Sequence, residues 1–169
     1  MTKSAAFVAS SVLVFACPAL AGEANFIVKA AQGGMAEVEA GELAANKATN
    51  SEVRKFALMM VKDHGAANQK LAALAKSEGI PWPETYGEAH RSQLKALQAV
   101  NGPRFDQAYM AQMVKAHEET VQLLKSEIAT GQDPEIRDHA AAMLPTVEMH
   151  LREAYRLTGR DYAPMPATP

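Results

Sequence analysis

The chain has 169 residues, a length typical of one domain, and a small net charge of −2 from 17 basic and 19 acidic residues. No basic patch with interleaved aromatic residues occurs, which argues against a nucleic-acid partner. The one cysteine, Cys17, excludes an intramolecular disulfide, and no apolar run is long enough to span a bilayer.

The first 21 residues have the features of a secretory signal peptide. Lys3 gives a positive start, residues 5–16 are apolar apart from two serines, and Ala19-Leu20-Ala21 is a small-x-small cleavage site. We predict cleavage after Ala21 and export across the inner membrane, most simply to the periplasm. Loss of Lys3 would leave a mature chain with a net charge of −3.

A second interpretation of the N-terminus remains open. Val14-Phe15-Ala16-Cys17 resembles a bacterial lipobox, which would make Cys17 the lipidated first residue of an envelope protein. Peripheral association with the envelope is therefore compatible with the sequence, whereas a membrane span is not expected.

After the signal peptide, the chain is rich in Ala, Leu, Met, Glu, Lys and Gln, which favour helices, and strand-like alternation is absent. Clusters of glycine, proline and turn-forming residues divide it at positions 49–51, 79–83, 101–103 and 131–134. These breaks predict long helices at about 25–48, 51–78, 103–130 and 134–157, with a short helix near 87–100.

The two outer connections are short and the middle one is long. This pattern predicts an all-α, ferritin-like four-helix bundle made of two antiparallel hairpins, joined by a crossover that contains the short helix. The bundle would occupy residues 22–158, followed by a disordered tail at 159–169.

Three of the predicted long helices carry a histidine on an apolar stripe whose members are spaced by three and four residues. These are His64, His117 and His150, and the segments MVKDH (60–64) and MVKAH (113–117) are nearly identical. Counting from the turns places His64 and His117 at one level. His150 lies about three residues away, roughly 4–5 Å along the bundle axis.

Glu37 is the acidic residue on the first long helix that best fits the same layer, because it lies 13 residues before Asn50 and His64 lies 14 after it. Glu39 and Glu42 are its competitors. A carboxylate and imidazoles in an apolar core are costly unless they are paired or bind a metal. We therefore predict one transition-metal site.

The predicted ligands are Glu37, His64, His117 and His150. Imidazole suits copper, zinc and iron, so the sequence does not select one metal. The alternative is that these histidines are core residues hydrogen-bonded to neighbours. Asp63 is a candidate for orienting a ligand, although it points to a different face of the helix from His64.

Other residues that attract attention have simpler interpretations. Met60 and Met113 precede their histidines by four residues and are expected to fill the core. His90 and His139 lie off the stripes and are expected at the surface.

Four stretches together resemble a known group of proteins: 26–37 with Gly33-Gly34-Met35-Ala36-Glu37, 56–64, 105–117 beginning Phe105-Asp106-Gln107-Ala108-Tyr109, and 144–150 beginning Leu144-Pro145-Thr146. They are similar to a bacterial exported domain family of unknown function. Its members are ferritin-like in fold and are often labelled predicted outer membrane proteins. The resemblance implies a helical bundle beyond the inner membrane and no established activity.

Di-iron carboxylate bundles use Glu-x-x-His on two helices. Here Val61, Val114 and Val147 stand three residues before the layer histidines, and no Glu-x-x-His occurs. We therefore expect metal binding without turnover, in metal handling or envelope stress. The alternatives are a structural or interaction protein of the cell envelope that binds no metal, and a metal-dependent redox enzyme.

Overall fold

A computed structural model describes residues 18–163 of the chain. Most of the predicted signal peptide, together with Cys17 and its lipobox alternative, lies outside the described residues. The described part contains five helices and no strand: α1 (Pro18–Lys47), α2 (Ser51–Ser77), α3 (Gly87–Ala99), α4 (Pro103–Thr130) and α5 (Pro134–Leu157).

The helix bounds agree with the sequence except at the start of α1, which begins at Pro18 rather than near residue 25. Proline is well tolerated in the first turn of a helix, and the Ala-Leu-Ala segment that follows favours helix. Cleavage after Ala21 would remove the first turn of α1 and retain Glu23.

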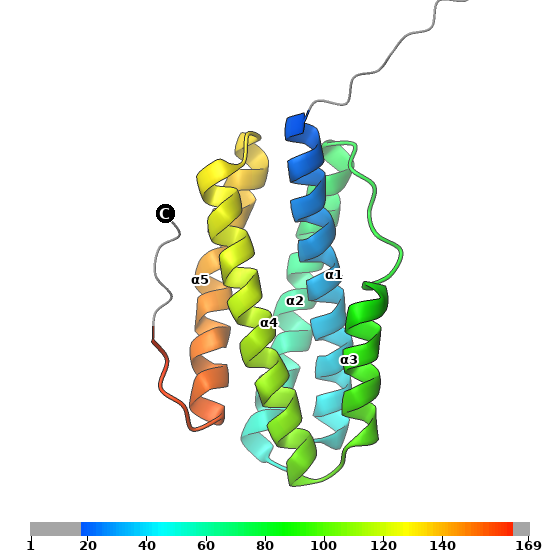
Figure 1. The fold of residues 1–169 in the computed structure, drawn as a ribbon, viewed down its shortest axis with the longest axis vertical. Coiled ribbons are helices and arrows are strands. Elements are labelled where there is room, and N and C mark those ends of the chain that lie inside the picture. The colour runs from blue at the N-terminus through cyan, green and yellow to red at the C-terminus, as the bar shows by residue number, and fades with distance from the viewer. Residues whose placement is uncertain (1–17, 164–169) are drawn as a thin grey trace, which may run out of the picture.

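The helices form two antiparallel hairpins that pack into a bundle (Figure 1). α1 packs chiefly on α2 and α4 on α5, while contacts of α1 with α4 and of α2 with α5 close the bundle. α3 lies along the outside, mainly against α1. The long connection between α2 and α4 therefore covers one side of the bundle and leaves its core to the four long helices.

Each hairpin turn is held by a carboxylate from the opposite hairpin. Asp106 on α4 accepts hydrogen bonds from the Thr49 N–H (3.0 Å), the Thr49 hydroxyl (2.5 Å) and the Asn50 N–H (2.8 Å). Glu23 on α1 accepts from the N–H groups of Gln132 (3.0 Å) and Asp133 (2.5 Å). These bonds fix the relative height of the two hairpins.

The first turns of α2 and α5 are capped by the side chains that precede them. The Asn50 side chain accepts from the Glu52 N–H, and the Asp133 side chain accepts from the N–H groups of Glu135 and Ile136. Such caps satisfy N–H groups that have no partner within the helix. No helix in the described residues is long and apolar enough to cross a membrane.

The end of α5 is followed by an ordered stretch. Gly159 ends the helix with a left-handed φ of 67°. The Tyr162 ring then lies 5.6 Å from the Tyr155 ring, and Arg160 lies over the same ring. Residues 159–163, which we expected in a disordered tail, are thus placed against α5, and residues 164–169 lie outside the described part.

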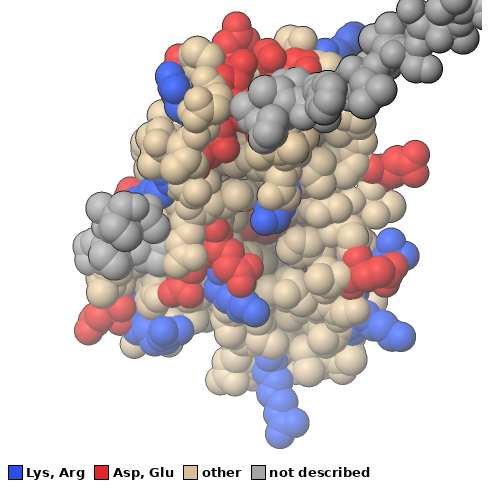
Figure 2. All heavy atoms as spheres, turned by 45° about the horizontal axis from the view of Figure 1, so that its top comes forward, with Lys and Arg blue, Asp and Glu red and all other residues tan. Residues whose placement is uncertain are grey.

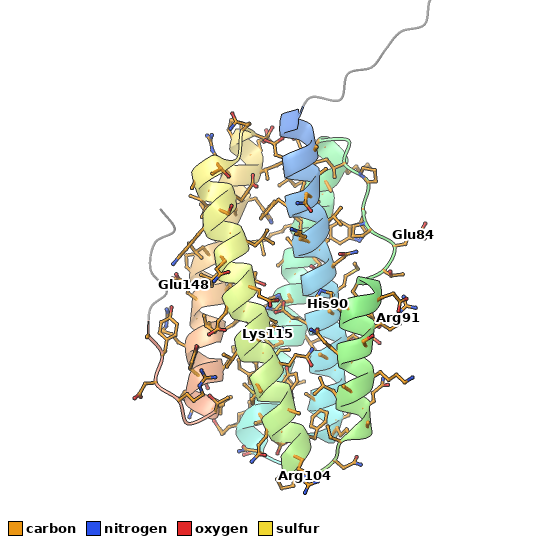
Figure 3. All side chains as sticks on the ribbon, viewed as in Figure 1. Glu84, His90, Arg91, Arg104, Lys115 and Glu148 are labelled. Carbon is orange, nitrogen blue, oxygen red and sulfur yellow. The ribbon has the colours of Figure 1, made fainter. Side chains whose placement is uncertain are left out.

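Side chains fill the space between the helices, and labelled charged residues such as Glu84, Arg91 and Arg104 lie on the outside (Figure 3). The core is apolar over most of its length, with Phe56, Phe105 and Tyr109 among its largest members. One layer differs, because it contains buried histidines and a buried glutamate.

Candidate metal centre

The structure brings the three stripe histidines together. The ring centroids are 5.4 Å apart for His64 and His117, 5.3 Å for His64 and His150, and 5.5 Å for His117 and His150. All three side chains are buried, with relative exposures of 4%, 0% and 1%. The expected offset of His150 is therefore small enough for its ring to reach the other two.

Glu37 reaches this layer because α1 and α2 approach closely. Gly34 and Gly41 lie one turn before and one turn after Glu37. A Cβ atom at Gly34 would meet the Asn68 side chain, and at Gly41 it would lie 3.0 Å from the Ala57 carbonyl oxygen. Larger residues at either glycine would push the helices apart and move the Glu37 carboxylate away from α2.

The Glu37 carboxylate faces the Nδ1 atoms of two rings. Its Oε2 lies 3.0 Å from Nδ1 of His64 and its Oε1 lies 3.3 Å from Nδ1 of His117. The His117 contact lacks hydrogen-bond geometry, and the His117 Nδ1 instead lies 2.9 Å from the Met113 carbonyl oxygen. These acceptors favour the tautomers in which Nδ1 of both rings carries the proton.

In His150, unlike in His64 and His117, the nitrogen beside an oxygen acceptor is Nε2 rather than Nδ1. Its Nε2 lies 3.1 Å from Oδ2 of Asp63, so Nε2 is the nitrogen that donates to the carboxylate. Asp63 does orient a layer histidine, but the histidine is on α5 rather than the neighbouring His64 on α2. The sequence singled out the residue and could not indicate its partner.

The remaining ring nitrogens are the Nε2 atoms of His64 and His117 and the Nδ1 of His150. All three are buried and have no hydrogen-bond partner within residues 18–163. The three residues can each offer one ligand atom such that these atoms lie within 4.8 Å of one another. Since buried polar atoms are nearly always paired, three unpaired nitrogens in one layer require an explanation.

The electrostatics of the layer favour neutral rings at two of the three positions. Burial opposes the charge of Glu37, but the surrounding histidines outweigh it and hold the pKa of its carboxyl at about 2. Burial also opposes protonation of His64, but Glu37 raises the pKa of that imidazole above its usual 6.5. Burial lowers the pKa of His117, and burial with the other two histidines lowers that of His150 to about 4.

These positions revise the expected role of Glu37. The sequence predicts it as a fourth ligand, whereas its oxygens face protonated ring nitrogens and it is not a member of the three-histidine group. Glu37 therefore neighbours the Nδ1 atoms of His64 and His117, and not their unpaired Nε2 atoms.

The donor set fits a transition metal. Metal–nitrogen bonds of about 2.0–2.1 Å correspond to nitrogen separations of roughly 3.4 Å, and one ring nitrogen from each histidine lies within 4.8 Å of the others. Three imidazoles leave at least one coordination position open. Met60 and Met113 are fully buried, in agreement with their expected place in the core.

The other two histidines are less exposed than we expected. His90, labelled on α3 in Figure 3, is partly buried, and its Nδ1 lies 3.3 Å from Gln93 Oε1. His139 on α5 is also partly buried, and its Nε2 is shielded from solvent. Neither contributes a ligand atom to the three-histidine group.

Fold and site together define an all-α bundle with a buried three-histidine centre. The chain belongs to the family described as domain of unknown function DUF4142, whose profile matches residues 16–157. This agrees with the resemblance to a bacterial family of unknown function. Among curated proteins, no sequence match was found.

Several solved structures share the fold at low sequence identity. A DUF305 fragment from Deinococcus radiodurans has 15% identity and a TM-score of 0.73, covering 82% of this chain and 95% of that one. A DUF305 protein from Streptomyces coelicolor, described as secreted, has 17% identity and a TM-score of 0.69, covering 87% and 98%. A structure described as CopM in the Cu(II)-bound form has 17% identity and a TM-score of 0.68, covering 81% and 95%.

Proposed function

We propose that this protein is an exported helical bundle that binds one transition-metal ion at His64, His117 and His150 without turnover. The observation that carries the proposal is the set of three unpaired, buried ring nitrogens, each on a ring whose other nitrogen faces an oxygen acceptor. Such acceptors fix the tautomer and raise the basicity of a metal-binding imidazole. Glu37 and Asp63 are the orienting carboxylates.

Copper is the first metal to test, with zinc and iron as alternatives. Imidazole binds all three, and copper(II) lies above the others in the usual order of affinity. The Cu(II)-bound state of CopM, a protein of similar fold, supports the same choice. Export is supported by the signal-peptide features of residues 1–21 and by the secreted DUF305 protein of similar fold.

The direct test is metal analysis of the protein purified from the periplasm of cells grown with added copper, zinc or iron. We expect about one metal ion per chain in the wild type and its loss in the triple variant His64→Gln, His117→Gln, His150→Gln. His90→Gln is the control, because this histidine lies outside the centre. Wild-type protein that contains no metal, and takes up none in vitro, would refute the proposal.

A binding role without turnover also has to be distinguished from redox chemistry, because the centre leaves a coordination position open. We expect the copper-loaded protein to consume neither oxygen nor peroxide catalytically. Turnover that disappears in the triple variant would assign the protein to the enzymes instead. The structural role would be favoured if the wild type lacks metal and the triple variant is folded and binds the same envelope proteins as the wild type.

A further inference from the structure

A groove between α2 and α5 leads to the three-histidine centre. It has a volume of about 370 Å³, and Asp63, His64 and His150 are among the residues that line it. A second groove of about 470 Å³, bounded by α1, α3 and α4, reaches Glu37 but none of the three histidines. The α2/α5 groove is therefore the better route from solvent to the free ring nitrogens.

Small residues form part of the walls of this groove. Ala66 and Ala67 on α2 face Ala142 on α5 across it. The groove lies at the level of two candidate ligands, His64 and His150.

Two further side chains with metal-binding chemistry line the same groove. His139 and Met143 are one helical turn apart on α5, and Met143 precedes His150 by two turns. Along the helix axis, His139 and Met143 are roughly 6 Å apart, and Met143 and His150 roughly 10 Å. The three residues therefore follow one face of α5 toward the centre.

His139 has an unpaired ring nitrogen and a lowered pKa. Its Nε2 is buried and lacks a hydrogen-bond partner among the residues that the structure describes. Burial and the nearby Lys70 ammonium both lower the pKa of this imidazole, which keeps it neutral. A neutral imidazole one turn from a thioether is a donor pair that suits copper(I).

The His139 end of the groove also lies toward an acidic end of the molecule. Glu23, Glu78, Asp133 and Glu135 are close enough there to influence one another electrostatically. Figure 2 shows acidic side chains gathered on this end, where α1 begins and α4 meets α5. Negative charge at this end raises the local concentration of cations, although the Lys70 ammonium, which lines the groove itself, opposes this effect beside His139.

We propose that the α2/α5 groove is the entry path for copper(I), and that His139 and Met143 bind the incoming ion before it passes, still as copper(I), to the three histidines. This inference rests on the proposed function, because it requires a metal at His64, His117 and His150. His139 and Met143 act in delivery, and the final complex does not include them.

The test is the rate at which purified protein takes up copper(I) from a weak chromophoric chelator in a stopped-flow instrument under anaerobic conditions. We expect the double variant His139→Gln, Met143→Leu to take up copper about tenfold more slowly than the wild type. Its final stoichiometry and affinity should equal those of the wild type. The double variant His90→Gln, Met59→Leu changes the same residue types away from the groove and should leave the rate unchanged.

A second variant blocks the path without removing a donor. Ala142→Trp places a large side chain in the groove and should also slow uptake, whereas Ala111→Trp, at an exposed alanine on α4, should not. Both sites are exposed, so both variants should fold.

The outcomes separate the two proposals. Wild-type rates in both groove variants, with full binding at equilibrium, would refute the entry path and leave the metal centre intact. Loss of final affinity in the His139→Gln, Met143→Leu variant would place these residues in the final complex and also refute the transient role. Absence of copper binding by the wild type would refute both proposals.

Discussion

At the residue scale, two carboxylates decide which nitrogen of His64 and which nitrogen of His150 faces the centre, while the Met113 carbonyl does so for His117. Glu37 is buried beside Nδ1 of His64, and Asp63 lies beside Nε2 of His150. An ion pair this deeply buried is weak evidence for stability, because removing the charges from water is costly. Its contribution to ring orientation is the more important one for a binding site.

Glu37→Gln should lower the affinity for metal by about 10–100-fold, because a neutral amide is a weaker acceptor for the His64 N–H than a carboxylate. Competition titration against a chelator measures the change, with circular dichroism to confirm the fold. Glu42→Gln, an exposed position on the same helix, is the matched control and should bind like the wild type. Equal affinities for the two variants would argue against an orienting role.

Metal affinity should fall as the pH is lowered from about 8 to 5.5. The pKa of His64 is raised above 6.5 by Glu37, although burial opposes this, so a proton competes with metal for His64 even near neutral pH. His117 and His150 have lowered pKa values and begin to compete only at more acidic pH. Chelator competition at several pH values tests this, and an affinity that is constant over the range would contradict it.

At the element scale, a carboxylate at each end of the bundle accepts hydrogen bonds from the turn of the opposite hairpin. Asp106 holds the turn between α1 and α2, and Glu23 holds the turn between α4 and α5. Glu37 and His64 belong to one hairpin, and His117 and His150 belong to the other. These contacts therefore set the height of the first pair relative to the second. A shift between hairpins would separate the rings.

Asp106→Ala should destabilise the protein by about 2–4 kcal/mol, because it leaves two backbone N–H groups and a hydroxyl without their charged acceptor. Urea unfolding followed by circular dichroism measures the loss. Asp138→Ala, which removes an exposed carboxylate on α5, should change stability by less than about 0.5 kcal/mol. A similar small effect for Asp106→Ala would mean that the turn is held by its own local geometry.

At the scale of the whole molecule, the buried layer makes the metal-free fold sensitive to acid. His150 has a pKa of about 4 in the folded protein and near 6.5 when unfolded, so the unfolded chain binds the proton first as the pH falls. The Glu37 carboxyl has the same effect at lower pH, because its pKa is about 2 in the folded protein and 4.5 when unfolded. His64 has the opposite effect on stability, because its pKa is raised in the folded protein. Its contribution to stability is complete below pH 6.5 and is lost as the pH rises.

The metal-free protein should therefore be most stable near neutral pH and lose on the order of 2–3 kcal/mol through His150 between pH 6.5 and 4. Urea unfolding at several pH values measures this, and His150→Gln should reduce the dependence in that window. Undiminished wild-type stability at pH 4 would contradict the assignment.

The sequence predicted the fold more completely than the site. The starts of α2 and α5 followed from the turn-forming clusters at 49–51 and 131–134, within which Asn50 and Asp133 cap the helices by local hydrogen bonds. The meeting of His64, His117 and His150 followed from helical periodicity and equal counts from the turns. The exact role of Glu37 did not, because it depends on the close approach of α1 and α2 at Gly34 and Gly41.

By itself, the sequence determined the number of helices, their faces and the placement of three histidines on apolar stripes, because helical periodicity and capping act over a few neighbouring residues. Only the tertiary structure decided that Asp63 pairs with His150, 87 positions away, and that a groove leads from His139 to the centre. Such features depend on side-chain packing between helices that are distant in the chain. Local sequence patterns carry no information about this packing.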